Sequence, residues 1–194
     1  MVALVVAVVV GYLLGTLPTA VAVGARLGVD PRRSGSGNPG ASNAYRTMGR
    51  IPAAVVLGGD LVKGAVATGA GWALGGHTVA LAAGVAAVVG HTFPVRGRGG
   101  KGVATCAGML LVAFPLAALA AALGWVLLAV VARRPSVASL ALAVGLPLGV
   151  AVAGAPGVEV ALLALAAAVV VVRHADNIRR LVHGTEAPIR VARP

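Results

Sequence analysis

Long apolar runs dominate this chain, and they constrain its fold more than any other feature. Hydrophobic residues make up 59% of the 194 residues, and several runs approach the ~20 residues that a helix needs to cross a bilayer. A bilayer interior offers no hydrogen-bonding partners to an open backbone, so such runs fold as helices. The sequence therefore predicts an all-α integral membrane protein that forms one domain over residues 1–194.

Three short polar segments interrupt the apolar runs: Ser34–Arg46, Arg96–Thr105 and His174–Glu186. Their glycines, hydroxyls, amides and cations are the groups that proteins use to bind phosphate. Acidic residues are scarce in them, with Asp176 and Glu186 the two present. We therefore expect a site where the membrane meets water.

The basic residues predict the topology. The apolar stretches run approximately over Val2–Arg26, Pro52–Trp72, Thr78–Val95, Val103–Val131, Val137–Ala153 and Val158–Val172. The basic clusters between them are Arg26–Arg50, Arg96–Lys101, Arg133–Arg134 and Arg173–Arg193, the last including Arg190 and Arg193, whereas the turns Gly75–His77 and Gly154–Gly157 carry no Lys or Arg. Basic loops stay on the cytoplasmic side, so the chain is expected to start outside and end in the cytoplasm.

The stretch Val103–Val131 conflicts with this rule if it forms one span, because a basic cluster lies at each end. A break at Pro115 resolves the conflict, since proline disfavours helical geometry at the preceding Phe114. The first piece would then be about 12 residues, or roughly 18 Å, long. We therefore expect seven transmembrane helices, some of them short. A single tilted helix over this stretch is the alternative.

The first polar segment combines glycines with Ser36, Asn38, Asn43 and Arg46. Glycine lets the backbone approach a ligand closely, and Asn43 and Arg46 would share one face of a short helix. The alternative is a polar loop that ends in a helix cap at Ser42 or Asn43.

The other two segments also suit anion binding. Gly99–Gly102 precedes an apolar helix and is similar to a phosphate cradle with Lys101 as its cation, although its spacing is not that of a nucleotide-hydrolysing P-loop. His174 and Asn177 lie three residues apart, on one helical face. The alternative for this last segment is a basic juxtamembrane helix that binds lipid headgroups.

Charges inside the apolar stretches need partners. Asp60 and Lys63 stand at i,i+3 and are expected to pair, whereas Glu159, Trp72 and Trp125 are expected at the membrane interfaces. The single cysteine, Cys106, permits no intrachain disulfide or multi-cysteine metal site, and neither a metal nor a cofactor is expected. The net charge of +11 follows the cytoplasmic loops, which favours membrane lipids and phosphate as partners over nucleic acid.

Five motifs occur together and in order: GSGNPGASNAYRTMG (35–49), GDLVKG (59–64), GHTFPV (90–95), GGKGVAT (99–105) and HADNIRRLVHGTE (174–186). This set resembles the bacterial acyl-phosphate-dependent glycerol-3-phosphate acyltransferases of the PlsY type. The resemblance covers nearly the whole chain, from Gly11 to Glu186.

The resemblance implies a multi-pass enzyme of the inner (plasma) membrane whose active site faces the cytoplasm. It would move an acyl group from acyl phosphate to the 1-hydroxyl of glycerol 3-phosphate, giving lysophosphatidate and phosphate. The residues implied as catalytic are Lys101, Ser139, His174 and Asn177. Those expected to bind substrate are Ser36, Asn38, Asn43, Arg46, Gly99, Gly100, Lys101, Gly102, Thr105, Ser136 and Glu186.

The chain departs from the family between His91 and Gly99, where the loop is shorter than usual and Arg98 is expected to replace a lysine. Neither a Ser-His-Asp constellation nor the His-x-x-x-x-Asp motif of other glycerolipid acyltransferases is visible. We therefore expect direct attack, with His174 or a substrate phosphate oxygen as the base. A small-anion or glycerol-phosphate transporter is the alternative function. The concentration of polar segments on one side, without an inverted repeat, argues against it.

Overall fold

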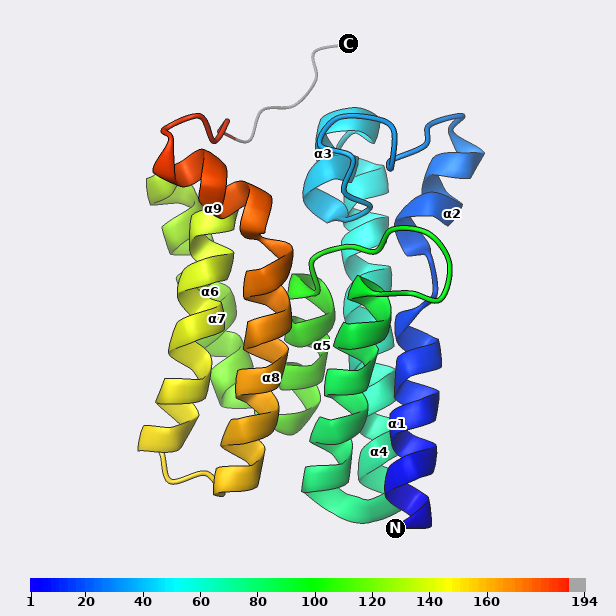
Figure 1. Ribbon diagram of the computed structural model, residues 1–194, viewed down its shortest axis with the longest axis vertical. Coiled ribbons are helices and arrows are strands. Elements are labelled where there is room, and N and C mark those ends of the chain that lie inside the picture. Colours follow the sequence, from blue (N-terminus) through cyan, green and yellow to red (C-terminus); the bar gives the residue numbers. More distant parts are fainter. Residues whose placement is uncertain (189–194) are drawn as a thin grey trace.

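The computed structural model describes residues 1–188, so Arg190 and Arg193 lie outside the described residues. Its helices are α1 (Val2–Gly15), α2 (Thr19–Arg26), α3 (Ala41–Met48), α4 (Arg50–Thr92), α5 (Val103–Ala113), α6 (Pro115–Ala132), α7 (Pro135–Val152), α8 (Gly157–Arg173) and α9 (Ala175–Val182). They form an up-and-down bundle in which α1 begins at one end, while α2, α3 and α9 gather at the other (Figure 1). The three polar segments meet at this second end.

Several helices are long and apolar enough to cross a membrane. In residues 1–188 four stretches qualify: Val2–Arg26, Arg50–Thr92, Pro115–Ala132 and Pro135–Val152. The number is five if α8 and α9, which meet at 59°, count as one bent span. Together with the comparisons reported below, these helices confirm an all-α, multi-pass membrane protein.

Two of the expected stretches differ in detail from the structure. Val2–Arg26 is not one continuous helix, because Pro18 has non-helical backbone angles and separates α1 from α2. Conversely, α4 is a single element of 43 residues that joins Pro52–Trp72 to Thr78–Val95. It bends at Gly75 and Gly76, whose angles are non-helical, so the expected turn is present at that point.

The predicted break before Pro115 is confirmed. Phe114 has φ −140° and ψ 71°, and α6 starts with Pro115 in its first turn. The start of α5 and the end of α6 lie at the same end of the bundle, since Lys101 and Arg134 both reach the Asn177–Glu186 pair. The two helices therefore form a hairpin, which excludes a single tilted helix.

Glycines let the helices approach closely around α4. Gly11 and Gly15 of α1 lie against the backbone of Ala83 and Ala87, and a Cβ at either glycine would overlap those carbonyl oxygens. Small residues four apart are a common device for packing membrane helices. Gly64 of α4 likewise faces the backbone of α5. These contacts fix α5, and with it the loop that carries Lys101.

The end of the bundle away from the polar segments contains a buried polar pair. Nδ1 of His77 lies 2.6 Å from Oε1 of Glu159, and Nε2 lies 2.9 Å from the carbonyl oxygen of Ala113. The His77 ring also packs edge-on against Trp72 and Phe114. Glu159, which was expected at the membrane interface, lies in the first turn of α8 and is buried between helices, where this pairing compensates its charge.

The expected Asp60–Lys63 ion pair is present, with 2.9 Å between Nζ and Oδ1 and both side chains 4% exposed. Lys63 also donates to the carbonyl oxygen of Leu17, at the break between α1 and α2. This bond satisfies a second proton of the buried ammonium and ties α4 to the polar end of the bundle.

Candidate active site

A cavity of about 550 Å³ opens at the polar end of the bundle. The predicted site residues that line it are Ser36, Asn38, Asn43, Arg46, Lys101, Gly102, Ser136, Ser139, His174, Asn177 and Glu186. They come from the loop before α3, from α3, from the start of α5, from α7, and from α9 with the segment after it. The fold therefore brings the three polar segments together around one space.

A chain of hydrogen bonds crosses the cavity mouth. Nζ of Lys101 donates to Oδ1 of Asn177, and Nδ2 of Asn177 donates to Oε1 of Glu186 at 2.6 Å. Ser136 donates to the same carboxylate oxygen at 2.8 Å, while Arg180 binds the other at 2.6 Å. Glu186 thus holds the amide of Asn177 in one orientation, with its oxygen toward Lys101.

Lys101 and Glu186, the two charged groups that Asn177 joins, both have shifted pKa values. The pKa of Lys101 is lowered to about 8, mainly because the amine is buried; Glu186 raises this pKa, and the nearby Arg180, Arg46 and Arg173 lower it. For Glu186, burial opposes ionisation, but the hydrogen bonds from Asn177, Ser136 and Arg180 hold its pKa below the usual value. Near neutral pH the cavity therefore contains an ammonium that has few water contacts and attracts anions.

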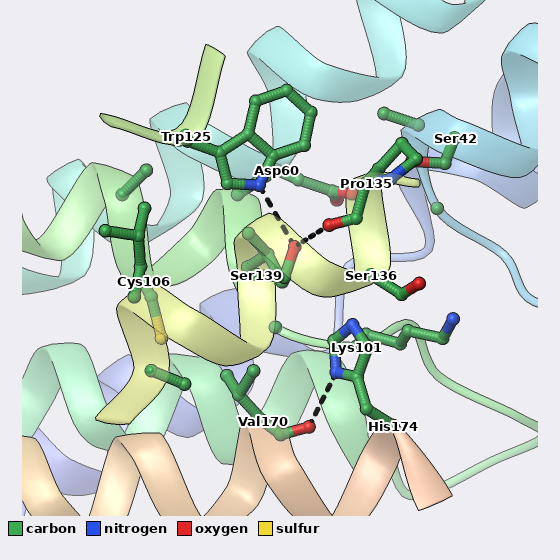
Figure 2. A pocket seen from close by; sticks show the side chains of 18 of the residues that line it. Ser42, Asp60, Lys101, Cys106, Trp125, Pro135, Ser136, Ser139, Val170 and His174 are labelled. Atoms are coloured by element: carbon green, nitrogen blue, oxygen red, sulfur yellow. Dashed lines mark hydrogen bonds between the residues drawn. The ribbon is translucent and has the colours of Figure 1, made fainter. Parts of the chain in front are cut away.

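His174 is buried at the junction of α8 and α9. Its Nδ1 lies 2.8 Å from the carbonyl oxygen of Val170 (Figure 2). A carbonyl can only accept, so Nδ1 is the donor, and the neutral ring has its free electron pair on Nε2. This tautomer can take a proton from a molecule in the cavity.

Ser139 is held in place by two hydrogen bonds. Its hydroxyl donates to the carbonyl oxygen of Pro135 at 2.9 Å and accepts from Nε1 of Trp125 at 3.0 Å (Figure 2). Trp125 was expected at the membrane interface, but it lines the cavity instead. Because the Ser139 proton is already used, the geometry favours a positioning role for this serine.

Gly99 and Gly100, which were expected to bind substrate, do not line the cavity. The N–H of Gly100 donates to the carbonyl oxygen of His91, and both glycine carbonyls accept bonds from Arg173. A Cβ at Gly100 would overlap the His91 ring. These contacts shape the loop around His91 and present Lys101, and they occupy the N–H of Gly100; binding of an anion by this loop stays a prediction.

Arg98 lies outside the cavity lining and is 3.8 Å from Asp176 at the surface. Its replacement of the family lysine therefore stays a prediction.

Thr105, which was also expected to bind substrate, does not line the cavity. It is fully buried, with its backbone against Gly64 on the far side of α5. One residue later, Cys106 does line the cavity. The reason is the helical step of 100° per residue, which carries neighbouring positions to different faces.

The side chain of Asn43 makes its hydrogen bonds within the loop that precedes α3. Its Nδ2 donates to the carbonyl oxygens of Pro31 and Ser34, and its Oδ1 accepts from the N–H of Ser36. Neither Ser42 nor Asn43 caps the helix, because α3 starts at Ala41 with Gly40 as its N-cap. Asn43 thus orders the loop that presents Ser36 and Asn38 to the cavity.

Residues outside the set predicted to bind substrate or to act in catalysis also contribute to the site. Trp125 pairs with Ser139, Arg134 donates to the backbone oxygen of Glu186, and Arg180 binds its carboxylate. Asp60 and His91 also line the cavity, 3.5 Å apart between Oδ1 and Nδ1. Among residues 1–188, no cluster of three or more His, Cys, Asp and Glu side chains could hold a metal ion.

The chain matches known proteins over nearly its whole length. The family model for glycerol-3-phosphate acyltransferase matches residues 5–184. A glycerol-3-phosphate acyltransferase 2 of Moorella thermoacetica is 45% identical over 93% of this chain and 94% of its own length. A glycerol-3-phosphate acyltransferase of Halorhodospira halophila is 41% identical over 95% and 96%, respectively.

The fold also matches solved structures. The crystal structure of PlsY (YgiH), an integral membrane glycerol 3-phosphate acyltransferase, superposes in its glycerol 3-phosphate form with a TM-score of 0.92, at 32% identity over 96% of both chains. Its lysophosphatidic acid form gives a TM-score of 0.89 at 32% identity over 95% of this chain and 94% of the other. These matches identify an enzyme and set aside the transporter alternative. The chain belongs to the glycerol-3-phosphate acyltransferase family and is of the PlsY type.

Proposed function

We propose that this enzyme transfers a fatty acyl group from acyl phosphate to the 1-hydroxyl of glycerol 3-phosphate, giving lysophosphatidate and phosphate. The observation that carries the proposal is the division of the cavity into two parts. Its mouth is lined by Lys101, Arg46, His174 and other polar groups, whereas the remainder is lined by apolar side chains of α5–α8. Such a space suits an anionic headgroup joined to an acyl chain, with room for a second small anion.

The cations at the mouth support binding of two phosphate groups. Arg46 reaches the cavity from α3, and Lys101 reaches it from the loop before α5. Ser36 and Asn38 also line the mouth and can donate hydrogen bonds to phosphate oxygens. We assign glycerol 3-phosphate to the Arg46 side and the phosphate of the acyl donor to Lys101. Holding both substrates in one site supplies much of the rate enhancement.

The reaction needs no covalent intermediate with the protein. The substrate hydroxyl oxygen attacks the carbonyl carbon, and the bond from that carbon to the phosphate oxygen breaks, with its electron pair leaving on phosphate. Lys101, which is held by the amide oxygen of Asn177, is placed to stabilise the negative charge that develops. Nε2 of His174 accepts the hydroxyl proton, because its tautomer leaves that nitrogen free. A phosphate oxygen of the substrate is the alternative base.

We also propose a topology of seven transmembrane helices for the single domain. They are α1 with α2, the two halves of α4, and α5, α6, α7 and α8. With the cavity mouth at the basic end of the bundle, the positive-inside rule places the amino terminus outside and the active site in the cytoplasm. This arrangement suits an enzyme of the plasma membrane that draws glycerol 3-phosphate from the cytoplasm and releases product into the inner leaflet.

The experiment uses the full chain in lipid nanodiscs with labelled glycerol 3-phosphate. Palmitoyl phosphate, palmitoyl-CoA and palmitoyl-acyl carrier protein are offered separately as donors. We expect lysophosphatidate and an equal amount of phosphate with palmitoyl phosphate alone. Product from a thioester, with no product from acyl phosphate, would overturn the assignment of the donor.

A further inference from the structure

Three leucines lie at the end of the cavity away from Lys101 and His174, and we propose that they set the longest acyl chain that the enzyme accepts efficiently. They are Leu110 of α5, Leu146 of α7 and Leu163 of α8, and all three line the cavity. This inference rests on the proposed function, because it requires the acyl chain to occupy the apolar part of the cavity.

The lining residues of α8 show how deep the cavity runs. His174, Val170, Ala166 and Leu163 follow one another at helical spacing along one face of the helix. At 1.5 Å per residue, Leu163 lies roughly 16 Å below His174 along the helix axis. On α7 the lining residues run in the same direction, from Ser139 to Leu146. The leucines are therefore the last side chains that an acyl chain would meet.

On α7 and α8, an alanine lies next to each floor leucine on the side of the mouth. Ala143 of α7 and Ala166 of α8 are buried and line the cavity. Alanines on facing helices leave room for a chain to pass, whereas a leucine extends into the same space. The change from alanine to leucine along one face thus marks where the open channel ends.

The leucine floor rests on a packed layer that resists displacement. Leu110 and Leu163 belong to a buried cluster with Ala113 and Val150, against which Phe114 packs. Below Phe114, the His77 ring lies 4.9 Å away in an edge-on contact and pairs with Glu159. Close-packed interiors tolerate added volume poorly, so a longer chain would have to bend or leave the cavity rather than push the floor aside.

The first test compares Leu163→Ala with Leu165→Ala. Leu163 is 4% exposed at the floor, whereas Leu165 is 52% exposed on the outer face of the same helix. The full-length enzyme in nanodiscs is assayed with lauroyl, myristoyl, palmitoyl, stearoyl and arachidoyl phosphate. We expect Leu163→Ala to raise kcat/KM for the longest donors relative to myristoyl phosphate by about tenfold, while Leu165→Ala keeps the wild-type profile.

The second test shortens the apolar channel instead of lengthening it. Ala166→Leu narrows the channel three residues nearer to His174 and should shift the preference to shorter donors. Ala168→Leu adds the same volume at an exposed position of α8 and is the matched control. Leu163→Val removes less volume and serves if Leu163→Ala does not fold. It should shift the chain-length profile in the same direction as Leu163→Ala, but to a smaller extent.

The outcomes separate this proposal from the function on which it rests. Unchanged chain-length profiles in active Leu163→Ala and Ala166→Leu enzymes would overturn the floor while leaving the acyltransferase assignment intact. A wild-type enzyme that used none of the acyl phosphates would instead remove the proposed donor. Equal shifts in Leu163→Ala and Leu165→Ala would show that bilayer contact, and not the cavity floor, selects the chain.

Discussion

Lys101 and Asn177 are joined by a direct hydrogen bond from Nζ to Oδ1, although 76 residues separate them in the chain. The bond connects the loop before α5 to helix α9, and Glu186 completes it by accepting from Nδ2 of Asn177. Because the carboxylate fixes the amide, the ammonium is aimed into the cavity before any substrate arrives. Preorganised charge of this kind is the main source of electrostatic catalysis.

Removal of the Asn177 amide should therefore lower turnover strongly. We expect Asn177→Ala to reduce kcat about 10²- to 10³-fold, the range found when one polar group that stabilises developing charge is removed. Steady-state assays with palmitoyl phosphate measure the effect. Ile178→Ala, at the next position of α9, is the control and should keep activity within a few-fold of wild type. A mild effect of Asn177→Ala would show that Lys101 needs no partner.

The lowered pKa of Lys101 predicts an alkaline limit to activity. With a pKa of about 8, the amine is mostly charged at pH 7 and mostly neutral at pH 9. The charged form binds phosphate, so kcat/KM should fall about tenfold per pH unit above pH 8. A bound anion favours the charged form, so the limit in kcat should lie at higher pH. The rates are corrected for uncatalysed hydrolysis of acyl phosphate.

Lys101→Arg provides the check on this assignment. Arginine stays charged over the whole range, so the variant should lose the alkaline limit even if its overall rate is lower. An unchanged limit in Lys101→Arg would assign the titration to another group.

The two possible bases can be separated at His174. If Nε2 of His174 accepts the substrate proton, His174→Gln should lower kcat by at least about 10²-fold with little change in KM. If a phosphate oxygen is the base, the same variant should mainly raise KM for glycerol 3-phosphate. His183→Gln, on the exposed surface beyond α9, is the control and should behave as wild type in either case.

The sequence was sufficient for the all-α membrane architecture and for the grouping of the three polar segments, and the reasons are physical. The distribution of arginines and lysines required an even number of crossings between Lys101 and Arg133, which together with Pro115 located the break at Phe114. The phosphate-binding residue types occurred in three segments, and all three meet at one cavity. Charge sidedness and local backbone preference act over short stretches, so they can be read directly from the chain.

The details that the sequence could not supply depend on contacts between distant helices. Thr105 and Cys106 look equally suitable in sequence, and only the packing of α5 on α4 decides which one faces the cavity. The carbonyls of Gly99 and Gly100 are bound by Arg173, and Trp125 turns inward to reach Ser139. No periodicity in a single helix specifies its partners, so these relationships follow from the assembled bundle alone.

Cys106, the only cysteine in the chain, offers a direct probe of the cavity that it lines. We expect N-ethylmaleimide to inactivate the enzyme slowly, because the thiol is partly buried. Prior addition of a non-hydrolysable acyl phosphonate should slow that loss, since its chain would cover the thiol. Cys106→Ser should remain active and resist the reagent. Inactivation of Cys106→Ser at the wild-type rate would show that the loss arises elsewhere.

Glu159 tests whether the pair at the far end of the bundle holds the floor of the cavity. Glu159→Gln replaces the carboxylate beside His77 by a neutral amide, which weakens a hydrogen bond that joins α8 to α4. We expect a loss of about 1–3 kcal/mol in stability, measured as a lower midpoint of thermal unfolding in detergent, while kcat with myristoyl phosphate stays near wild type because the polar residues of the mouth are untouched. Val158→Ala, at the neighbouring and exposed position, should leave the midpoint unchanged. A Glu159→Gln enzyme as stable as wild type would show that apolar packing alone closes this end of the bundle.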